Sequence, residues 1–386
     1  MDRRHFLSIG AAGVAAAWLP RVGFAQPGEG LGYRRLLVLV ELKGGNDALN
    51  AVVPYADPAY YALRPRLAIK RDEVLQLDER TGLHPALKPL HGLWEAKDLA
   101  IVQGVGYPQP NLSHFRSIEI WDTASRSDQY LGEGWLARAF AAQRVPAEFA
   151  ADGVVVGASD FGPLAGTGTR TIALTDTEQF LRQARLGNTP ARRGNAALNH
   201  IVKVQDDIAQ AAAHLNPNIA FKTAFPRSPF GNAVRTAAQL AANPAGIGAI
   251  RLSLNGFDTH QNQANVHQRL LGELAEGLAA LKGALLEVGR WQSTLVMTYA
   301  EFGRRPRENN SGGTDHGTAA AHFVAGGGVR GGLYGEPPRL EQLQGGNLMH
   351  AVDFRSLYAT ALEQWWGMKS QGPLGGRFQA LDLLKA

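Results

Sequence analysis

The chain has 386 residues, 45% of them hydrophobic and 19% charged, with 45 Gly and 20 Pro. This composition is typical of a globular protein with a sizeable core, and it excludes a disordered or fibrous chain. The formal charge of +5 comes from scattered Lys and Arg, so we expect no nucleic-acid partner. The chain has no cysteine, which excludes disulfides, Cys nucleophiles and thiolate metal sites.

The first 25 residues have the pattern of an export signal. Arg3 and Arg4 precede an apolar stretch from Ile9 to Leu19, and a small-residue site ends at Ala25. An amphipathic first helix is the alternative, but charge, apolar run and cleavage site follow one another in the order that a signal requires. We expect a twin-arginine-type signal at residues 1–25, the twin-arginine translocase as a partner during export, and a soluble periplasmic or secreted protein. No segment has the roughly 20 apolar residues that a stable membrane span needs.

Apolar runs alternate with helical patterns in the first third of the remaining chain. Residues 34–40 form a nearly continuous apolar run that ends at two glycines, which predicts a strand buried on both faces of a parallel sheet. Residues 99–103 predict a second such strand. Helices are predicted at residues 86–95 and 113–123, on either side of that second strand.

The last third of the chain shows the same alternation. A strand at 247–254, a long helix at about 265–288 and a strand at 293–299 make a βαβ unit of the expected size. A short strand is predicted at 322–325, and a final helix at about 353–366. Alternation at both ends of the chain predicts a doubly wound α/β sheet.

The middle of the chain, roughly residues 125–245, differs in character. Helical patterns such as residues 196–215 dominate it, and residues 188–193 are polar and rich in helix breakers. We interpret this region as a helical insertion or cap within a single domain that spans residues 26–386.

Ligands bind beyond the carboxyl ends of parallel strands, so polar residues after predicted strands are the first candidates for a site. Asp47 follows the first strand after a two-glycine turn that could present its carboxylate above the sheet; an ordinary capping Asp is the alternative. Ser113 opens a helix after the second strand. Free backbone N–H groups there suit a nucleophile or an anion, and the alternative is simple N-capping.

Two Asp and His pairs are the candidate metal ligands. Asp258 and His260 follow a strong strand, and Asp315 and His316 lie between glycines that allow adjacent side chains to converge. An ordinary turn and a flexible surface loop are the respective alternatives. Together with Asp47, these carboxylates and imidazoles suit one or two divalent ions such as Zn, Mn, Mg or Ca.

Further residues near these positions could complete a site. Glu301 follows a strand directly and is a candidate ligand or base, and His322 is a candidate late ligand, with a core histidine as the alternative. Arg304 and Arg116 are candidates to bind the anionic part of a substrate, although surface ion pairs are an equal alternative for Arg304. The chain has no phosphate-binding loop and no Gly-x-Ser-x-Gly nucleophile elbow.

A set of motifs in a fixed order gives the chain its resemblance to a known family. Besides the signal, these motifs are Lys43-Gly44-Gly45-Asn46-Asp47-Ala48-Leu49-Asn50, Val53-Pro54-Tyr55, Ser113-His114-Phe115, Asp258-Thr259-His260, Glu301-Phe302-Gly303-Arg304 and Gly313-Thr314-Asp315-His316-Gly317. The chain resembles the DUF1501 family over nearly all of residues 26–386. That family is itself similar to the alkaline phosphatase and sulfatase superfamily.

The resemblance implies both a fold and a set of roles. The implied fold is a three-layer α/β sandwich with a mostly parallel central sheet. The implied roles are metal ligation by Asp47, Asp258, His260, Asp315 and His316, a nucleophilic Ser113, and a late His at His322 or His350. The sulfatase motif that needs a Cys is excluded because the chain has none.

Three functions follow from this reading. The leading hypothesis is an exported hydrolase that uses divalent metal ions to cleave phosphate or sulfate esters of small molecules or polymers. The alternative is a non-catalytic exported protein that keeps the fold and binds a partner or a surface polymer. An acyl or glycoside hydrolase that uses Ser113 and His114 or paired acids is a third reading, and it lacks a motif of its own.

Overall fold

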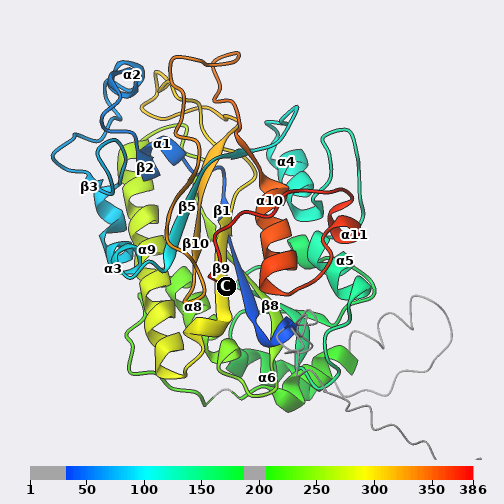
Figure 1. Ribbon diagram of the computed structural model, residues 1–386. Coiled ribbons are helices and arrows are strands. Elements are labelled where there is room, and N and C mark those ends of the chain that lie inside the picture. Colours follow the sequence, from blue (N-terminus) through cyan, green and yellow to red (C-terminus); the bar gives the residue numbers. More distant parts are fainter. Residues whose placement is uncertain (1–31, 187–205, 217, 386) are drawn as a thin grey trace, which may run out of the picture.

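The computed structural model describes residues 32–186, 206–216 and 218–385, and its centre is a nine-stranded sheet (Figure 1). The strand order is β11-β5-β10-β9-β1-β8-β6-β7, with β12 beside β5. Within the described residues, neighbouring strands run parallel except at β10, which is antiparallel to both β5 and β9. The strands are β1 (Leu36–Lys43), β5 (Leu99–Gly106), β6 (Ala151–Val156), β7 (Thr171–Leu174), β8 (Ile247–Asn255), β9 (Thr294–Tyr299), β10 (Ala320–Ala325), β11 (Gly332–Gly335) and β12 (Val352–Asp353).

Helices cover both faces of this sheet, which makes three layers (Figure 1). The helices α3 (His91–Glu95), α8 (Pro229–Ala241) and α9 (Gln263–Glu287) pack on one face, and α4 (His114–Thr123), α5 (Trp135–Ala142), α10 (Phe354–Ala359) and α11 (Gln371–Leu374) on the other. The remaining elements are α1 (Ala48–Ala51), α2 (Pro58–Leu63), α6 (Thr177–Leu186), short 3₁₀ turns at Gly32–Arg34, Pro85–Leu90, Gly162–Leu164 and Trp291–Ser293, and a small sheet of β2 (Val52–Val53), β3 (Leu75–Gln76) and β4 (Gly82–Leu83).

The pattern of burial along β1 explains the layers. Leu36, Val38 and Val40 belong to the core on the α9 face, whereas Leu37 and Leu39 belong to the core on the α4 face. Successive side chains of a strand point to opposite faces, so a strand that is apolar throughout must be covered on both. The continuous apolar run of residues 34–40 therefore predicted a central strand correctly, and the mostly parallel α/β fold is confirmed.

The structure differs from the sequence prediction in the middle of the chain. The segment 125–245 contains helices α5, α6 and α8, but it also supplies β6 and β7, which extend the main sheet beside β8. Residues 206–214 of the helix predicted at 196–215 are helical, whereas its first half, the polar segment 188–193 and the whole predicted signal at 1–25 lie outside the described residues. The helix predicted at 353–366 is present as α10 followed by a π-helical turn at Thr360–Trp365.

The reversed direction of β10 positions the candidate site. The carboxyl ends of β1, β8 and β9 meet at one edge of the sheet, so the residues that follow them lie there. Because β10 is antiparallel to β9, the residues that precede β10 lie at the same edge. Gly44, Asp258, Glu301 and His316 are brought together in this way. No helix in the described residues is long and apolar enough to cross a lipid bilayer.

Candidate metal centre

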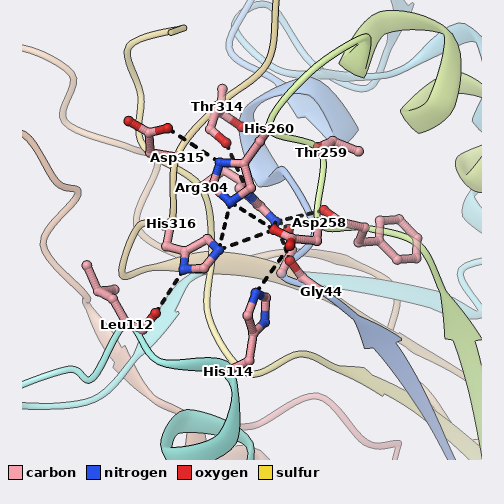
Figure 2. A network of polar contacts seen from close by, with 12 residues as sticks. Gly44, Leu112, His114, Asp258, Thr259, His260, Arg304, Thr314, Asp315 and His316 are labelled. Carbon is pink, nitrogen blue, oxygen red and sulfur yellow. Dashed lines mark hydrogen bonds and ion pairs between the residues drawn. The ribbon is translucent and has the colours of Figure 1, made fainter. Parts of the chain in front are cut away.

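Three histidine side chains converge on the carboxylate of Asp258 (Figure 2). Its Oδ1 lies 3.1 Å from His260 Nε2 and 3.2 Å from His316 Nε2, and its Oδ2 lies 3.3 Å from His114 Nε2. The two Nε2 atoms of His260 and His316 are 2.9 Å apart. The Asp and His residues at 258, 260 and 316 were predicted from the sequence as metal ligands.

The Nδ1 atom of each imidazole faces an oxygen that can accept a hydrogen bond. For His114 this oxygen is Glu301 Oε1 at 2.9 Å, and for His316 it is the carbonyl of Leu112 at 2.8 Å. For His260 it is Asp315 Oδ1 at 3.4 Å. A carbonyl accepts but cannot donate, so Nδ1 of His316 carries the proton and its Nε2 has a free lone pair that points into the cluster.

This arrangement fits a divalent cation. Three imidazole nitrogens and one carboxylate are a donor set that zinc and related metals prefer. Metal–ligand bonds of about 2.0–2.1 Å place tetrahedral donors a little over 3 Å apart, close to the separations in this cluster. His114, Asp258 and His316 each offer one donor atom, and these atoms all lie within 4.8 Å of one another. Burial lowers the pKa of His316 below 6.5, which favours the neutral ring that a metal requires.

Arg304 holds the loops that carry the cluster. The residue is 2% exposed, and its Nη2 lies 2.6 Å from Asp258 Oδ1. Burial alone would raise the pKa of Asp258, but the hydrogen bond and charge of Arg304 outweigh burial and lower the pKa to about 2. Each of its three nitrogens also donates to backbone carbonyls, which are those of Gly44, Gly45, Phe257 and Thr314. Arg304 therefore has a positioning role here, whereas the sequence predicted anion binding.

The structure places Asp47 apart from the cluster. Its carboxylate pairs with Arg64, with Oδ2 2.5 Å from Nη1 and Oδ1 2.9 Å from Nη2, and both side chains are almost completely buried. The side-chain amide of Gln263 also donates to the Asp47 carboxylate. The backbone N–H of Leu49 donates to it as well, which makes Asp47 the N-cap residue of α1. Asp47 was predicted as a metal ligand, but both oxygens of its carboxylate bind Arg64, which lies at the end of α2.

Ser113 lies between two residues that contact the cluster. Leu112 binds His316 through its carbonyl, and His114 faces Asp258. Ser113 is exposed and is the N-cap residue of α4, but its hydroxyl makes no hydrogen bond to the first turn of the helix. Simple N-capping does not account for this serine.

The other predicted residues have varied surroundings. The guanidinium of Arg116 donates to the carbonyls of Arg126, Ser127 and Gln129 and lies 3.8 Å from the ring centre of Tyr130, so the surrounding loop occupies it. His322 is completely buried on β10, with its ring 5.2 Å from that of Trp121. Neither of its ring nitrogens has a hydrogen-bond partner among the described residues, and burial lowers its pKa to about 3. His350 lines a separate cavity that is described below.

Three residues, His114, Glu301 and Asp315, have places that differ from the roles that the sequence predicted for them. His114 was named only within a motif and as part of a third reading, yet it is one of the three histidines that face Asp258. The available signal was its position as the first residue of a helix after a strand. Glu301, predicted as a ligand or base, lies behind His114, where its Oε1 also accepts from the backbone N–H of Gly44 at 2.9 Å. Asp315 lies behind His260 in the same way.

The protein is an α/β protein with a mostly parallel sheet. A cluster of three histidines and one aspartate lies at the carboxyl edge of that sheet. The profile of the DUF1501 family, described as a protein of unknown function, matches residues 70–368. The chain belongs to this family. No curated protein sequence matches it significantly.

Several solved structures are similar to this chain at low sequence identity. The C-terminal periplasmic domain of EcEptC from Escherichia coli, in complex with Zn, is 10% identical over 76% of this chain and 73% of its own, with a TM-score of 0.38. The phosphonate monoester hydrolase SpPMH from Silicibacter pomeroyi is 13% identical over 89% and 77%, with a TM-score of 0.40. The alkaline phosphatase from the Antarctic bacterium TAB5 is 12% identical over 77% and 94%, with a TM-score of 0.32. All three TM-scores are below 0.5.

Proposed function

We propose that this protein is a metal-dependent hydrolase of phosphate or sulfate esters, with a metal centre formed by His114, Asp258, His260 and His316. One observation carries the proposal: all three histidines have Nδ1 facing an oxygen acceptor and Nε2 facing Asp258. Outer carboxylates and carbonyls that orient imidazoles in this way are typical of metal sites. Glu301, Asp315 and the carbonyl of Leu112 are the outer groups.

A divalent ion held by these ligands would supply positive charge, which lowers the pKa of an oxygen nucleophile and offsets charge on the transferred group. Ser113 is the proposed nucleophile. Its Oγ forms a bond to phosphorus or sulfur, the bond to the leaving alcohol oxygen breaks, the serine proton passes to water, and the alcohol oxygen takes a proton from water. A water molecule then cleaves the seryl ester, so the net reaction consumes one water. The free backbone N–H groups at the start of α4 would stabilise the negative charge of the phosphate or sulfate group beside Ser113.

Export by the twin-arginine route is part of the same proposal. It is supported by Arg3, Arg4 and the apolar stretch that follows them. Replacement of both arginines by lysine should leave the protein in the cytoplasm, as measured by cell fractionation and blotting. Unchanged recovery from the periplasm or medium would contradict this route.

The first test of the metal centre is elemental analysis of protein purified without chelator. We expect stoichiometric divalent metal in the wild type and its loss in Asp258→Ala, in His316→Ala and in the Asp315→Ala, His316→Ala double variant. His91→Ala is the matched control, because His91 lies at the start of α3 and pairs with Glu95. A wild type that contains no metal and gains none from Zn, Mn, Mg or Ca would refute the proposal.

The second test separates catalysis from binding. With the metal restored, the wild type should hydrolyse 4-nitrophenyl phosphate or 4-nitrophenyl sulfate, whereas Ser113→Ala should keep its metal and lose turnover. A non-catalytic binding protein remains the second candidate, because the predicted anion-binding residues Arg116 and Arg304 are both occupied by the protein itself. Full metal content with no turnover of either ester would favour this second candidate.

A further inference from the structure

A cavity of about 290 Å³ lies at the same edge of the sheet as the metal centre, but no ligand of that centre lines it. Its floor is formed by α1, the end of β5 and the start of β10, and its cover is formed by the chain between β11 and β12. The lining residues include Leu49, Val52, Gln103, Leu348, Met349 and Ala351.

The cover is fixed to β5 at both of its ends. β11 pairs with β5 as far as Gly335 opposite Gln103, and β12 rejoins β5 with Val352 opposite Val105. Between these points the N–H of Ala351 donates to the carbonyl of Gly104 at 2.8 Å. The chain 336–351 therefore leaves and rejoins one strand within a few residues of that strand, which fixes the cover over the cavity at both ends.

Gln103 offers this cavity an unused polar group. Its side chain lines the cavity and the residue is only 5% exposed, yet its amide has no hydrogen-bond partner among the described residues. Because the amide makes no bond within the protein, it is free to donate to or accept from a group bound in the cavity. The position of this amide points to a ligand with a polar group at one end.

The rest of the lining favours an uncharged, mostly apolar molecule. Leu49, Val52 and Leu348 form apolar walls, and Met349 is 48% exposed at the rim. The charged rim residues Glu336 and Arg339 pair with each other at 2.5 Å, which leaves no net charge for an ionic ligand to match. Burial of an unmatched ionic group would be unfavourable.

We infer that this cavity is a second ligand site, which binds a compact, uncharged and mostly apolar molecule through its walls and through one hydrogen bond to the Gln103 amide. The volume is at the lower end of the range of about 300–1,000 Å³ found for small-molecule sites. The site shares a chain segment with the metal centre, because Ala319 lies three residues after His316. Its occupation does not depend on the proposed hydrolase activity.

The test uses a matched pair of fluorescent probes on the whole protein. N-phenyl-1-naphthylamine is uncharged and carries one N–H, and 8-anilinonaphthalene-1-sulfonate is its charged analogue. We expect the uncharged probe to bind the wild type with 1:1 stoichiometry and at least tenfold more tightly than the charged one.

Two variants then assign the binding to this cavity. Ala351 is exposed, so Ala351→Phe should fill the cavity from the solvent side and weaken binding by at least tenfold. Gln103→Leu keeps the size of the side chain but removes the amide, and it should weaken binding by about fivefold. Ala96→Phe, on the exposed end of α3, is the control.

Each outcome bears directly on the inference. Equal affinity of wild type and both variants, or no 1:1 binding of the uncharged probe, would overturn it. Tighter binding of the sulfonate than of the uncharged probe would overturn the assignment of ligand class. A near-ultraviolet circular dichroism spectrum identical to wild type is required of each variant, and if Ala351→Phe fails this criterion, Gln103→Leu decides alone.

Discussion

Nη2 of Arg304 lies 2.6 Å from Oδ1 of Asp258, and that same carboxylate oxygen faces the Nε2 atoms of two histidines. A fully buried cation therefore holds the same carboxylate that the three imidazoles face (Figure 2). The same guanidinium binds carbonyls in the loops after β1 and β8 and in the loop before β10. One side chain thus sets the relative positions of three of the segments around the site.

Arg304→Lys should weaken metal binding by about 10–100-fold, because a single ammonium cannot replace a planar donor group that binds several acceptors. Titration with a competing metal-chelating dye measures the affinity. Arg307→Lys, at an exposed position nearby, should leave it unchanged. Wild-type affinity in Arg304→Lys would mean that the loops hold their positions without the guanidinium.

Glu301→Gln should weaken metal binding by about tenfold while the protein stays folded. The carboxylate accepts from the backbone N–H of Gly44 and orients His114, and a neutral amide of the same shape removes the negative charge that holds the imidazole in this orientation. The same dye competition applies, with Glu119→Gln as control, since Glu119 pairs with Arg116 on the exposed side of α4. If both variants bind metal equally well, Glu301 has no positioning role.

Asp47→Ala should reduce the free energy of unfolding by about 3–5 kcal/mol, because it leaves the buried guanidinium of Arg64 without its partner. Burial would raise the pKa of Asp47, but Arg64 outweighs burial and lowers it below 3.8. The native carboxylate is therefore stabilising above about pH 3.8, and this contribution disappears as the pH falls through the lowered pKa. Urea unfolding at pH 7 measures this loss in the free energy of unfolding. The metal affinity of folded Asp47→Ala should fall far less than that of Asp258→Ala.

His322→Leu should stabilise the protein, and more so in acid. Both ring nitrogens of His322 are buried without partners, which is unfavourable by about 1–3 kcal/mol. Its folded pKa of about 3 lies below the usual 6.5, so the unfolded chain binds the proton first. Stability is then lost as the pH falls from 6.5 towards 3, by up to about 1.4 kcal/mol per pH unit. Urea unfolding of wild type and variant at pH 7.5 and pH 5 should show a gap that widens at pH 5, with the exposed His214→Gln as control.

The sequence predicted much of the sheet because a strand covered on both faces is mostly apolar. Residues 36–40 and 99–102 are apolar throughout and lie in β1 and β5. The strands β6 and β7 were missed, since their neighbours in the chain have helical patterns and β7 is short and lies at the sheet edge. A pattern of local hydrophobicity does not report which segment completes the edge of a sheet.

The candidate site was predictable in part for a similar reason. Asp258 follows a strong strand and was found by that rule, whereas His316 precedes a strand and was found only through its glycine neighbours. The partners of Asp47 and Arg304 were not predictable, because Arg64 and the carbonyl groups reach them only in the folded chain. A polar residue in a sequence motif can be a ligand or a structural anchor, and tertiary contacts decide which.

The hydrogen bond between Leu112 and His316 joins residues that are 204 positions apart in the chain. Contacts of such long range form late in folding, because the loop between them must close first. A growing or truncated chain that ends before His316 would possess α4 and Asp258 but only two of the three imidazoles. Metal uptake would then mark the completion of folding, so that only finished molecules retain the ion.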